Sequence, residues 1–529
     1  MLRRGAAVSS TAQARTLVTE LIAAGVTDIV IAPGSRNGPI SLAALATPGL
    51  TTTVRIDERS AGFTALGLAK VTKRKTAVVV TSGTAGAHLL PALIEAAQSG
   101  VELIAITADR PKDLVNTGAN QTIEQLELFL AATKNVVDLD SSWPADMWRN
   151  EIQLALQQPG VIHLNPRFNE PLLPTDQWQG PEVSTAPNPV KPEKFVATDL
   201  LAGKRGLVIC SGDEINHAGE IAQKLNWPLI AEPTGTLHPN LISSGALVAA
   251  RFTDQVEIVV TVGRTGLARG INSLINTKPR IAVKVPTALT NVTALAQSNG
   301  ELELDSLSAI GHEWLNDWQD QASELRTKID ELVSSSSLGG LDVAATLLAN
   351  LKSQNLLHAA ASLSLRDLDY LMKPNSIGLI TANRGVNGID GIVASAIGAA
   401  TAWQRTGGGQ AYCLLGDVAL LHDLASLTIP STESMPNLRL VVVDNNGGGV
   451  FSTIEQRGVT GFERVFGTPH QVDLANLLGG FGIAVTVISN KAQLASIVTD
   501  SPGLSAVVIS GVDRDTEADL RKQIVNLTR

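Results

Sequence analysis

The sequence predicts an α/β protein of three domains, each built on a doubly wound parallel sheet. A short apolar run, a loop with glycine or proline and a helical segment recur in this order, the pattern of parallel sheets covered by helices. The 529 residues suffice for about three domains. Hydrophobic residues make up 44% of the chain and aromatic residues only 3%, so the cores should consist of Val, Ile, Leu and Ala.

The first domain is predicted at residues 1–180. A helical periodicity at 11–24 ends at Gly25, and strands are predicted at 27–32, 76–80 and 101–107. These strands lead into the loops PGSR, TSGTAG and ADRP. Ligands of open α/β sheets bind at the carboxyl ends of the strands, so functional groups are expected on these loops.

Two further domains are predicted beyond a Pro-rich linker at 181–193, where the composition shifts and the chain should be stiff and extended. The central domain, 194–335, has predicted strands at 206–210, 257–262 and 280–285 and a closing helix at 312–333. The last domain, 341–529, has predicted strands at 377–381, 438–443 and 505–510 and a Gly/Ala-rich helix at 391–403. It resembles the first domain in size and in its alternation of strands and helices, which indicates that the two domains share one architecture.

The most informative stretch spans residues 414–451. One buried strand ends in Gly416 and Asp417, a helical segment follows, and a second buried strand leads into the loop DNNGGG at 444–449. Two strands joined by a helix form a βαβ unit with both carboxyl ends at one edge of the sheet. The pattern therefore places Asp417 and Asn445 side by side.

A carboxylate, an amide oxygen and a backbone carbonyl freed by the glycines are oxygen ligands suited to Mg²⁺, which completes its shell with phosphate oxygens. Glycines also let backbone N–H groups approach a phosphate closely. The alternative is a helix-start Asp and an ordinary Asn-Gly turn. Because both features directly follow buried strands, the metal site is the favoured interpretation.

Glu58 lies where an extended segment meets a helix rich in Ala and Gly, in the phrase RIDERSAGFTALGLAK. It could cap that helix near its positive end. It could also present its carboxyl group to a buried nitrogen heterocycle. The residues by themselves favour neither interpretation.

Five arginines follow or interrupt apolar or glycine-rich segments near predicted strand ends. Guanidinium groups bind carboxylates by paired hydrogen bonds, so several of them in one cleft would suit substrates with several carboxylates. Some could instead form structural salt bridges, above all Arg366, which is flanked by Asp367 and Asp369. The five are Arg36, Arg110, Arg269, Arg366 and Arg384.

Other features exclude broad classes of function. The net charge of −9 argues against a general nucleic-acid surface. Cys210 and Cys413 lie in apolar runs without metal-binding or disulfide spacing. The segment SGTAG lacks a complete nucleotide-binding motif. No apolar run has the length of a membrane span, and we expect a cytoplasmic protein.

Several phrases together resemble the 2-succinyl-5-enolpyruvyl-6-hydroxy-3-cyclohexene-1-carboxylate synthase (MenD) family of menaquinone biosynthesis, within the thiamine-diphosphate enzyme superfamily. The first and last domains carry the resemblance nearly throughout, and GANQTIEQ and NRGVNGIDG are its most specific parts. The other phrases are APGSRNGPISLA, RIDERSAGFTALGLAK, TSGTAGAHLLPALIEA, ITADRP, SLSLRDLDY, GDVALLHDL and FERVFGTPH.

The resemblance implies the reaction and its ligands. The family decarboxylates 2-oxoglutarate with thiamine diphosphate and Mg²⁺ or Mn²⁺. It adds the resulting carbanion to isochorismate in a 1,4-addition, giving the product and CO₂. The three domains would be the pyrimidine-binding, central and diphosphate-binding domains. A homodimer or a dimer of dimers is implied, with active sites at the subunit interface.

The resemblance also implies residue roles. Glu58 would hydrogen-bond the aminopyrimidine, with Gln121 and Arg384 as further catalytic groups. Asp417, Asn445 and Gly447 would hold the metal. Ile389, Phe451, Gly416 and Val418 would contact the cofactor. The implied substrate contacts are Ser35, Arg36, Arg110, Asn120, Gln121, Arg269, Ser362, Arg366, Arg384 and Phe451.

Three alternatives remain at this level, and one is a non-catalytic regulator that kept the fold, against which the presence of Glu58, Asp417 and Asn445 argues. Another thiamine-diphosphate decarboxylase or an acetohydroxyacid-type synthase would share the pairs Gly416-Asp417 and Asn445-Asn446. The five arginines and the GANQ motif argue against this alternative. A nicotinamide dehydrogenase would need a complete Rossmann motif, which the sequence lacks.

Overall fold

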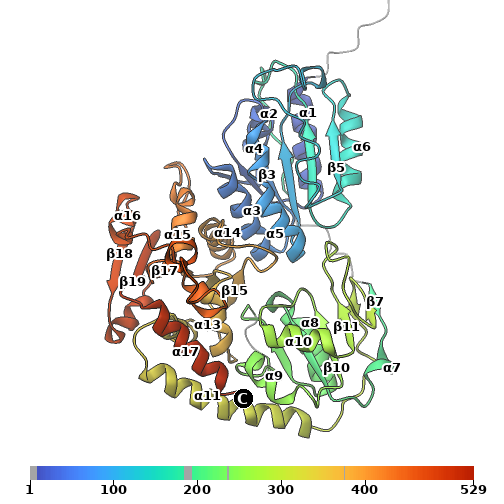
Figure 1. Ribbon diagram of the computed structural model, residues 1–529. Helices are drawn as coiled ribbons and strands as arrows, with labels where there is room; N and C mark the ends of the chain where they lie inside the picture. Colours follow the sequence, from blue (N-terminus) through green and yellow to red (C-terminus); the bar gives the residue numbers. More distant parts are fainter. Residues whose placement is uncertain (1–8, 184–192, 235–237, 375, 529) are drawn as a thin grey trace, which may run out of the picture. The chain divides into compact units, whose positions relative to one another are not determined.

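The computed structural model describes residues 9–183, 193–234, 238–374 and 376–528, which form parallel sheets of six, five and six strands and one two-stranded pair (Figure 1). This confirms the predicted fold class. Most of the predicted linker lies outside the described residues. Contacts divide the chain into two compact units. The first is Met1–Val190 with Gly385–Trp403 and Asp423–Met435, and the second is Lys191–Arg384 with Gln404–His422 and Pro436–Arg529.

The sheet of the first unit has the strand order β2-β1-β3-β4-β6-β5, with all neighbours parallel. Its strands are β1 (Asp28–Ile31), β2 (Thr51–Val54), β3 (Thr76–Val80), β4 (Leu103–Thr107), β5 (Val136–Leu139) and β6 (Ile162–Pro166). Its helices are α1 (Ser10–Ala23), α2 (Gly38–Leu45), α3 (Glu58–Thr72), α4 (Thr84–Ala87), α5 (Leu90–Ser99) and α6 (Ala145–Leu156). Helix α1 packs with α2 and α6, whereas α3 packs with α5 and against β1 and β3.

The central sheet of the second unit has the order β12-β11-β10-β8-β9. Its strands are β8 (Gly206–Cys210), β9 (Leu229–Ala231), β10 (Ile258–Val262), β11 (Arg280–Val283) and β12 (Ala296–Gln297), and β7 (Lys194–Phe195) pairs separately with β13 (Glu301–Leu302). The helices are α7 (Thr198–Leu201), α8 (Ile215–Leu225), α9 (Gly245–Phe252), α10 (Arg269–Thr277) and the long α11 (Glu313–Ser335). Strand β8 matches its predicted bounds.

The last sheet has the order β15-β14-β16-β17-β19-β18. Its strands are β14 (Leu356–Ala359), β15 (Leu379–Ala382), β16 (Ala411–Gly416), β17 (Leu438–Val443), β18 (Ala484–Ile488) and β19 (Leu504–Ile509). The helices of this part of the chain are α12 (Gly340–Asn350), α13 (Leu363–Leu371), α14 (Ile392–Arg405), α15 (Asp417–His422), α16 (Leu474–Gly480) and α17 (Arg514–Asn526). Numbered in chain order within each sheet, the first and last sheets share the order 2-1-3-4-6-5. The shared architecture indicated by their similar alternation of strands and helices is confirmed.

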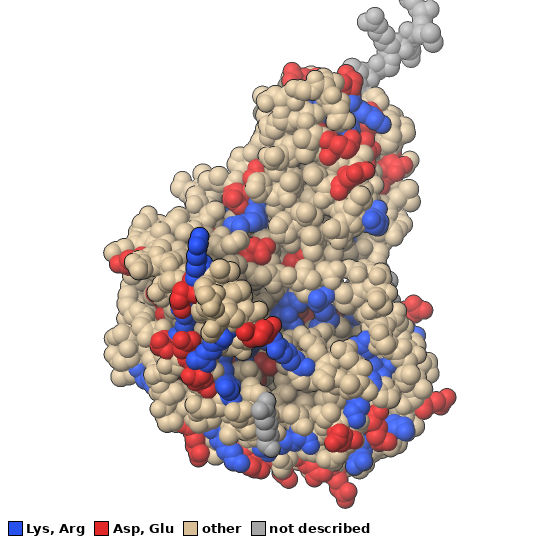
Figure 2. All heavy atoms as spheres, in the orientation of Figure 1, with Lys and Arg blue, Asp and Glu red and all other residues tan. Residues whose placement is uncertain are grey.

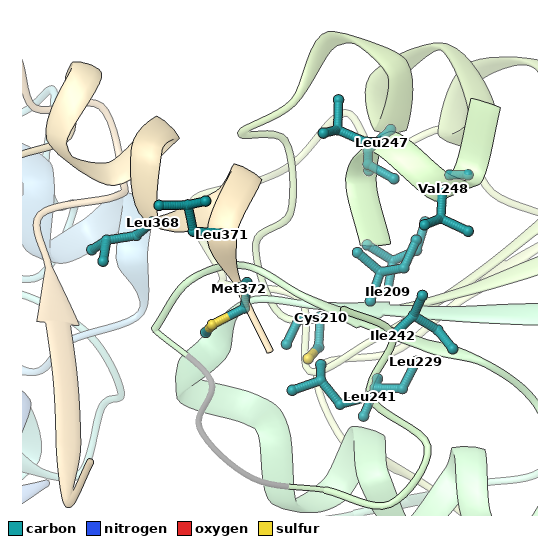
Figure 3. Packing of buried hydrophobic residues seen from close by; sticks show 14 of the residues in the cluster. Ile209, Cys210, Leu229, Leu241, Ile242, Leu247, Val248, Leu368, Leu371 and Met372 are labelled. Atoms are coloured by element: carbon teal, nitrogen blue, oxygen red, sulfur yellow. The ribbon is translucent and has the colours of Figure 1, made fainter. Parts of the chain in front are cut away.

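One hydrophobic core joins the central sheet to the last sheet. Its buried side chains come from β8, β9 and α9 of the central part and from α13, β16 and β19 of the last part. Figure 3 shows Leu368, Leu371 and Met372, in and just after α13, together with Ile209 and Cys210 of β8. Hydrogen bonds reinforce this packing, because Ser244 N donates to Met372 O at 2.7 Å.

The surface and the helices add two observations. On the face drawn in Figure 2, acidic and basic side chains are interspersed. No single helix among the described residues has the length and apolar composition to cross a membrane, and only the bent pair of α11 and α12 meets those two criteria together.

Candidate active site

The metal-binding prediction begins with Asp417, which directly follows β16. Strands β16 and β17 are neighbours and pair Gly416 with Val443, so the Asp417 loop and the DNNGGG loop leave the same edge of the sheet. Asp417 is 2% exposed. Its Oδ1 accepts from Val418 N at 2.8 Å, and its Oδ2 accepts from Gly447 N at 2.8 Å. The predicted βαβ unit is confirmed.

Gly447 holds the DNNGGG loop in this position. Its φ of +134° is one that residues with a side chain rarely adopt. A Cβ atom there would also overlap the carbonyl oxygen of Gly467. The glycine thus lets the loop turn so that its backbone N–H reaches Asp417.

The donor set of this loop fits a divalent cation. Asn445 Oδ1 is buried, and among the described residues it has no hydrogen-bond partner. Ligand atoms of Asp417, Asp444 and His470 lie within 4.8 Å of one another. Burial raises the pKa of the Asp417 carboxyl, and the N–H groups of Gly447 and Val418 act in the opposite direction. A bound cation would give the unpaired amide oxygen a partner and would offset the energetic cost of burying the Asp417 carboxylate.

Sequence reasoning missed His470 and Asp444 as possible metal ligands. His470 Nε2 lies 3.1 Å from Asp417 Oδ2, and His470 N donates to Asn446 Oδ1 at 3.2 Å. The histidine comes from a loop beyond the π-helical turn Glu463–Gly467, and no local spacing links it to Asp417. Asp444 could have been found from the sequence, because it is the first residue of the DNNGGG loop and directly follows the predicted strand at 438–443.

Glu58 is the first residue of α3. The residue that caps this helix is Asp57, whose side chain accepts from Ser60 N at 2.7 Å. Glu58 itself is half-buried, and its carboxylate makes no hydrogen bond or ion pair to any described residue. The capping role that Glu58 could have had is therefore filled by Asp57, which leaves the Glu58 carboxylate available to a ligand.

Helix α3 crosses α14 at small residues. A Cβ atom on Gly67 would overlap Ser395 O, and one on Gly398 would overlap Thr64 O. The reciprocal pattern shows that the two backbones are in direct contact, as the Gly/Ala-rich sequences of both helices allow. The Oγ atom of Ser395 also donates to Phe63 O at 3.2 Å. Glu58 thus begins a helix that is fixed along its length.

The loop that carries Ile389 is held by Glu95, a fully buried residue of α5 that sequence reasoning missed. The carboxylate of Glu95 accepts from Gly385 N at 2.8 Å, Val386 N at 2.7 Å and Asn387 N at 3.0 Å. Lys70 Nζ lies 3.8 Å from Glu95 Oε1. Successive backbone N–H groups turned to one carboxylate order the NRGVNGIDG segment, on which Ile389 is half-buried.

In the first unit, the loops with ADRP, SGTAG and GANQ meet at Arg110. Its guanidinium donates to Ser82 Oγ and to Gln121 O, the latter at 2.7 Å. Gln121 Nε2 in turn donates to Ser82 O at 3.0 Å. Asn120 is exposed on the same segment.

Arg36 belongs to the same region and donates to Phe168 O at 3.0 Å. Burial lowers the pKa of the Arg36 guanidinium, and the charge of Arg110 lowers it further. Arg36 and Arg110 are therefore near enough for their charges to act on each other, and Ser35, next to Arg36 in the chain, is exposed. The carboxylates of Glu170 and Asp109 act on Arg36 in the opposite direction. Two like charges near each other favour an anionic ligand.

In the second unit, Arg366 and Arg384 share the neighbourhood of Asp369. Ser362 is the residue before α13, and Arg366 lies one turn into that helix. Asp367 pairs with Arg521 through two hydrogen bonds of 2.7 and 2.6 Å, so this aspartate is not the partner of Arg366. Arg384 is paired with Glu232 at 2.9 Å.

Two predicted residues lie near one surface loop of the second unit. Arg269 is the first residue of α10, its side chain is 80% exposed, and its guanidinium lies 3.7 Å from Glu455. Phe451 lies in the 3₁₀ turn Gly449–Thr453, a few residues before Glu455, and is half-buried against Phe466. Arg269 is thus not grouped with the arginines near Asp369.

Known proteins resemble this chain over nearly its whole length. Residues 12–128 match the family described as "Thiamine pyrophosphate enzyme, N-terminal TPP binding domain". A protein of Thermobifida fusca named 2-succinyl-5-enolpyruvyl-6-hydroxy-3-cyclohexene-1-carboxylate synthase is 38% identical, over 97% of this chain and 98% of its own length. Proteins of the same name from a Nocardioides strain and from Saccharopolyspora erythraea are each 35% identical, over 98% and 97% of this chain and 97% of their own lengths.

Proposed function

The chain belongs to the 2-succinyl-5-enolpyruvyl-6-hydroxy-3-cyclohexene-1-carboxylate synthase family, and we propose that it joins 2-oxoglutarate to isochorismate in menaquinone biosynthesis, releasing CO₂. The observation that carries this proposal is the pairing of β16 with β17, which sets Asp417 beside the DNNGGG loop in a chain with full-length relatives of that name. Thiamine diphosphate, when bound, supplies the electron sink that makes decarboxylation feasible.

The cofactor would be held at two places in the chain. Glu58 would form a hydrogen bond with the aminopyrimidine ring and share a proton with it. This role is supported by the Glu58 carboxylate, which has no partner among the described residues and stands at the start of a well-packed helix. Asp417, Asn445 and Gly447 would hold Mg²⁺ or Mn²⁺, which is supported by the unpaired Asn445 Oδ1. Asp444 and His470 lie close enough to Asp417 to serve as further ligands of the cation.

The diphosphate and the reacting atoms would meet the residues around this loop. Gly416 and Val418 flank Asp417 and would contact the diphosphate. Ile389 and Phe451 would exclude water from the apolar part of the pocket, where a protonated by-product would otherwise form. Gln121 would assist proton transfer, which its position beside Arg110 supports.

The substrate carboxylates would be bound by the arginines. Arg36 and Arg110 form one pair, with Ser35, Asn120 and Gln121 near them. Arg366 and Arg384 form a second pair, with Ser362. Two pairs of guanidinium groups suit two acids with several carboxylates, and correct orientation of both acids supplies several kcal/mol of the rate enhancement. Arg269 would contribute only from the rim.

The test is CO₂ release from 2-oxoglutarate with thiamine diphosphate and Mg²⁺, with and without isochorismate. We expect release to rise with isochorismate, to stop on chelation and to return with Mg²⁺ or Mn²⁺. Glu58→Gln should lower the rate by about a hundredfold or more, because it removes the proton-transfer partner.

The matched control is Glu313→Gln, since Glu313 is also the first residue of a helix but is exposed on α11. It should leave the rate unchanged. Turnover of pyruvate in place of 2-oxoglutarate would contradict the assignment of substrates. A full rate in Glu58→Gln would contradict the role of Glu58.

A further inference from the structure

A carboxylate of the central domain lies against a predicted substrate arginine. Glu232 directly follows β9, and Arg384 follows β15, so each residue stands at the carboxyl end of a strand of its own sheet. Both belong to the second unit. The Glu232 side chain is 8% exposed and that of Arg384 is 22% exposed. A pair this sheltered is screened little by solvent.

The geometry of the pair leaves part of the guanidinium unused. Arg384 Nε donates to Glu232 Oε2 at 3.1 Å, and Nη2 donates to Oε1 at 2.9 Å. These contacts occupy the side edge of the guanidinium. An arginine has five N–H donors in a fixed plane. The end edge of the guanidinium is formed by Nη1 and the second hydrogen of Nη2. It makes no hydrogen bond to a described residue.

Glu232 also holds a loop of the central domain. Its Oε1 accepts from Gly266 N at 2.8 Å and from Leu267 N at 2.9 Å. Asn272 Nδ2 donates to Gly266 O at 3.1 Å and closes the loop from the other side. This loop joins β10 to α10. One carboxylate therefore connects Arg384 to the loop at residues 263–268.

The two domains that supply the pair are firmly joined. Ser244 Oγ donates to Tyr370 O at 2.6 Å, and Arg326 Nη1 donates to Leu371 O at 2.6 Å. Helix α13 packs against α9, and its apolar side chains belong to the same core as those of β8 (Figure 3). The position of Glu232 relative to α13 is therefore set by a shared core.

The charges around the pair favour an anion. The charges of Glu232, Arg366 and Arg384 all act on the carboxyl group of Asp369. Burial, and next to it the charge of Glu232, raises the pKa of Asp369 to about 7. At pH 7 about half of the Asp369 carboxyl groups are thus protonated, so the charge of the two guanidinium groups exceeds the combined negative charge of Glu232 and Asp369. The surplus positive charge is what a substrate carboxylate would neutralise.

We propose that Glu232 is a positioning residue that holds Arg384 by its side edge, so that the end edge of the guanidinium meets a substrate carboxylate. The same side chain ties this arginine to the loop at 263–268. This inference rests on the proposed function, because it takes Arg384 as a substrate contact. In this role Glu232 would act through Arg384 and would itself touch neither substrate nor cofactor.

The test compares KM for each acid and kcat in the full-length enzyme with thiamine diphosphate and Mg²⁺. Glu232→Gln keeps an oxygen for the loop N–H groups and removes the charged partner of Arg384. We expect KM for one of the two acids to rise about 5- to 50-fold, with little change in KM for the other acid or in kcat. Glu232→Asp keeps the charge on a shorter side chain and should recover part of the loss.

Two controls separate positioning from a general effect. Glu257→Gln removes one negative charge from the same domain, where Glu257 lies 3.7 Å from the exposed Lys204, and should change neither KM. If Glu232 acts through Arg384, the double variant Glu232→Gln/Arg384→Gln should have the same KM as Arg384→Gln alone.

The outcomes distinguish this inference from the proposed function. A wild-type enzyme without activity on 2-oxoglutarate would contradict the proposed function. An active wild-type enzyme in which Glu232→Gln leaves both KM values unchanged would overturn only the role of Glu232. Additive losses in the double variant would also overturn it. If Glu232→Gln does not fold, Glu232→Asp serves as the test variant: its shorter side chain should still raise KM for one acid, and unchanged KM values would overturn the role of Glu232.

Discussion

At the scale of single residues, two buried polar atoms without partners among the described residues have different meanings. Asn445 Oδ1 lies in the loop that follows β17, next to Asp444 of the Asp417, Asp444 and His470 cluster, where a cation can satisfy it. His163 Nδ1 lies inside the first unit, in the strand β6. The first atom indicates a ligand, whereas the second indicates a group that must stay uncharged.

The protonation state of His163 follows from its neighbours. Thr107 Oγ1 donates to Asn165 Oδ1 at 2.9 Å, so the same oxygen accepts from His163 Nε2, 2.7 Å away. The proton of the neutral ring is thus on Nε2. Protonation would add an N–H at Nδ1 that has no acceptor among the residues described. Burial accordingly lowers the pKa of His163 to about 4 from its ordinary value of 6.5.

The pH dependence of stability follows from this shift. A base with a lowered folded-state pKa contributes stability that is fully present above its unfolded pKa, 6.5, and is lost as the pH falls toward the folded pKa, about 4. We expect His163 to account for about 2 kcal/mol of stability lost between pH 8 and pH 5.

The measurement is the free energy of unfolding of the wild type and His163→Gln in urea at both pH values. The variant should lose less stability on acidification, and the control His312→Gln, at an exposed histidine, should behave as the wild type. Equal losses in the wild type and His163→Gln would contradict the prediction.

At the scale of elements, α3 and α14 are counterparts. Each follows the second strand of its sheet in chain order, and both sheets have the order 2-1-3-4-6-5. Their contact is also reciprocal, with a glycine of each helix against a carbonyl oxygen three residues before the other glycine. Such close crossings need residues without side chains.

Substitution at this crossing tests its contribution to stability. Gly398→Ala would place a methyl group against Thr64 O, which is backbone and cannot rotate away. We expect a loss of about 1–3 kcal/mol in the free energy of unfolding. Activity should fall too, because α3 carries Glu58.

A matched control comes from another helix. An added methyl group at Gly479 of α16 would have no neighbouring atom within 4 Å, so Gly479→Ala should be neutral or slightly stabilising. Thermal and urea unfolding of both variants gives the comparison. A Gly398→Ala variant as stable as Gly479→Ala would contradict the close crossing.

At the scale of the whole molecule, the proposed cofactor residues belong to different parts of the chain. Glu58 lies in the first unit, and Asp417 and the DNNGGG loop lie in the second. We propose that one subunit supplies Glu58 and another supplies Asp417 to each active site of a homodimer.

Mixing two inactive variants tests this arrangement. In a hybrid dimer of Glu58→Gln and Asp417→Asn subunits, one site would carry both substitutions and the other site neither. After subunit exchange we expect about a quarter of the wild-type rate, because half of the dimers are hybrids with one intact site in two. Each variant alone should stay inactive, and no recovery after verified exchange would indicate sites within one subunit.

The sequence was sufficient to predict the sheet edges. Strands such as Thr76–Val80 and Gly206–Cys210 are short apolar runs bounded by turn residues. Their first and last residues could therefore be predicted from the sequence. The strand Thr51–Val54 was missed because three threonines lack the apolar signal, and it forms by pairing with β1. The same logic located Asp417 and the DNNGGG loop, since each directly follows a buried strand.

By itself, the sequence determined the α/β class, the shared architecture of the first and last domains, and the family, because these depend on local patterns along the chain. Only the tertiary structure decided that Asp57 rather than Glu58 caps α3, that Glu95 orders the NRGVNGIDG segment, that His470 reaches Asp417 and that Glu232 holds Arg384. Most of these contacts join residues far apart in the chain. Their partners are chosen by how the sheets and helices pack, which no local spacing encodes.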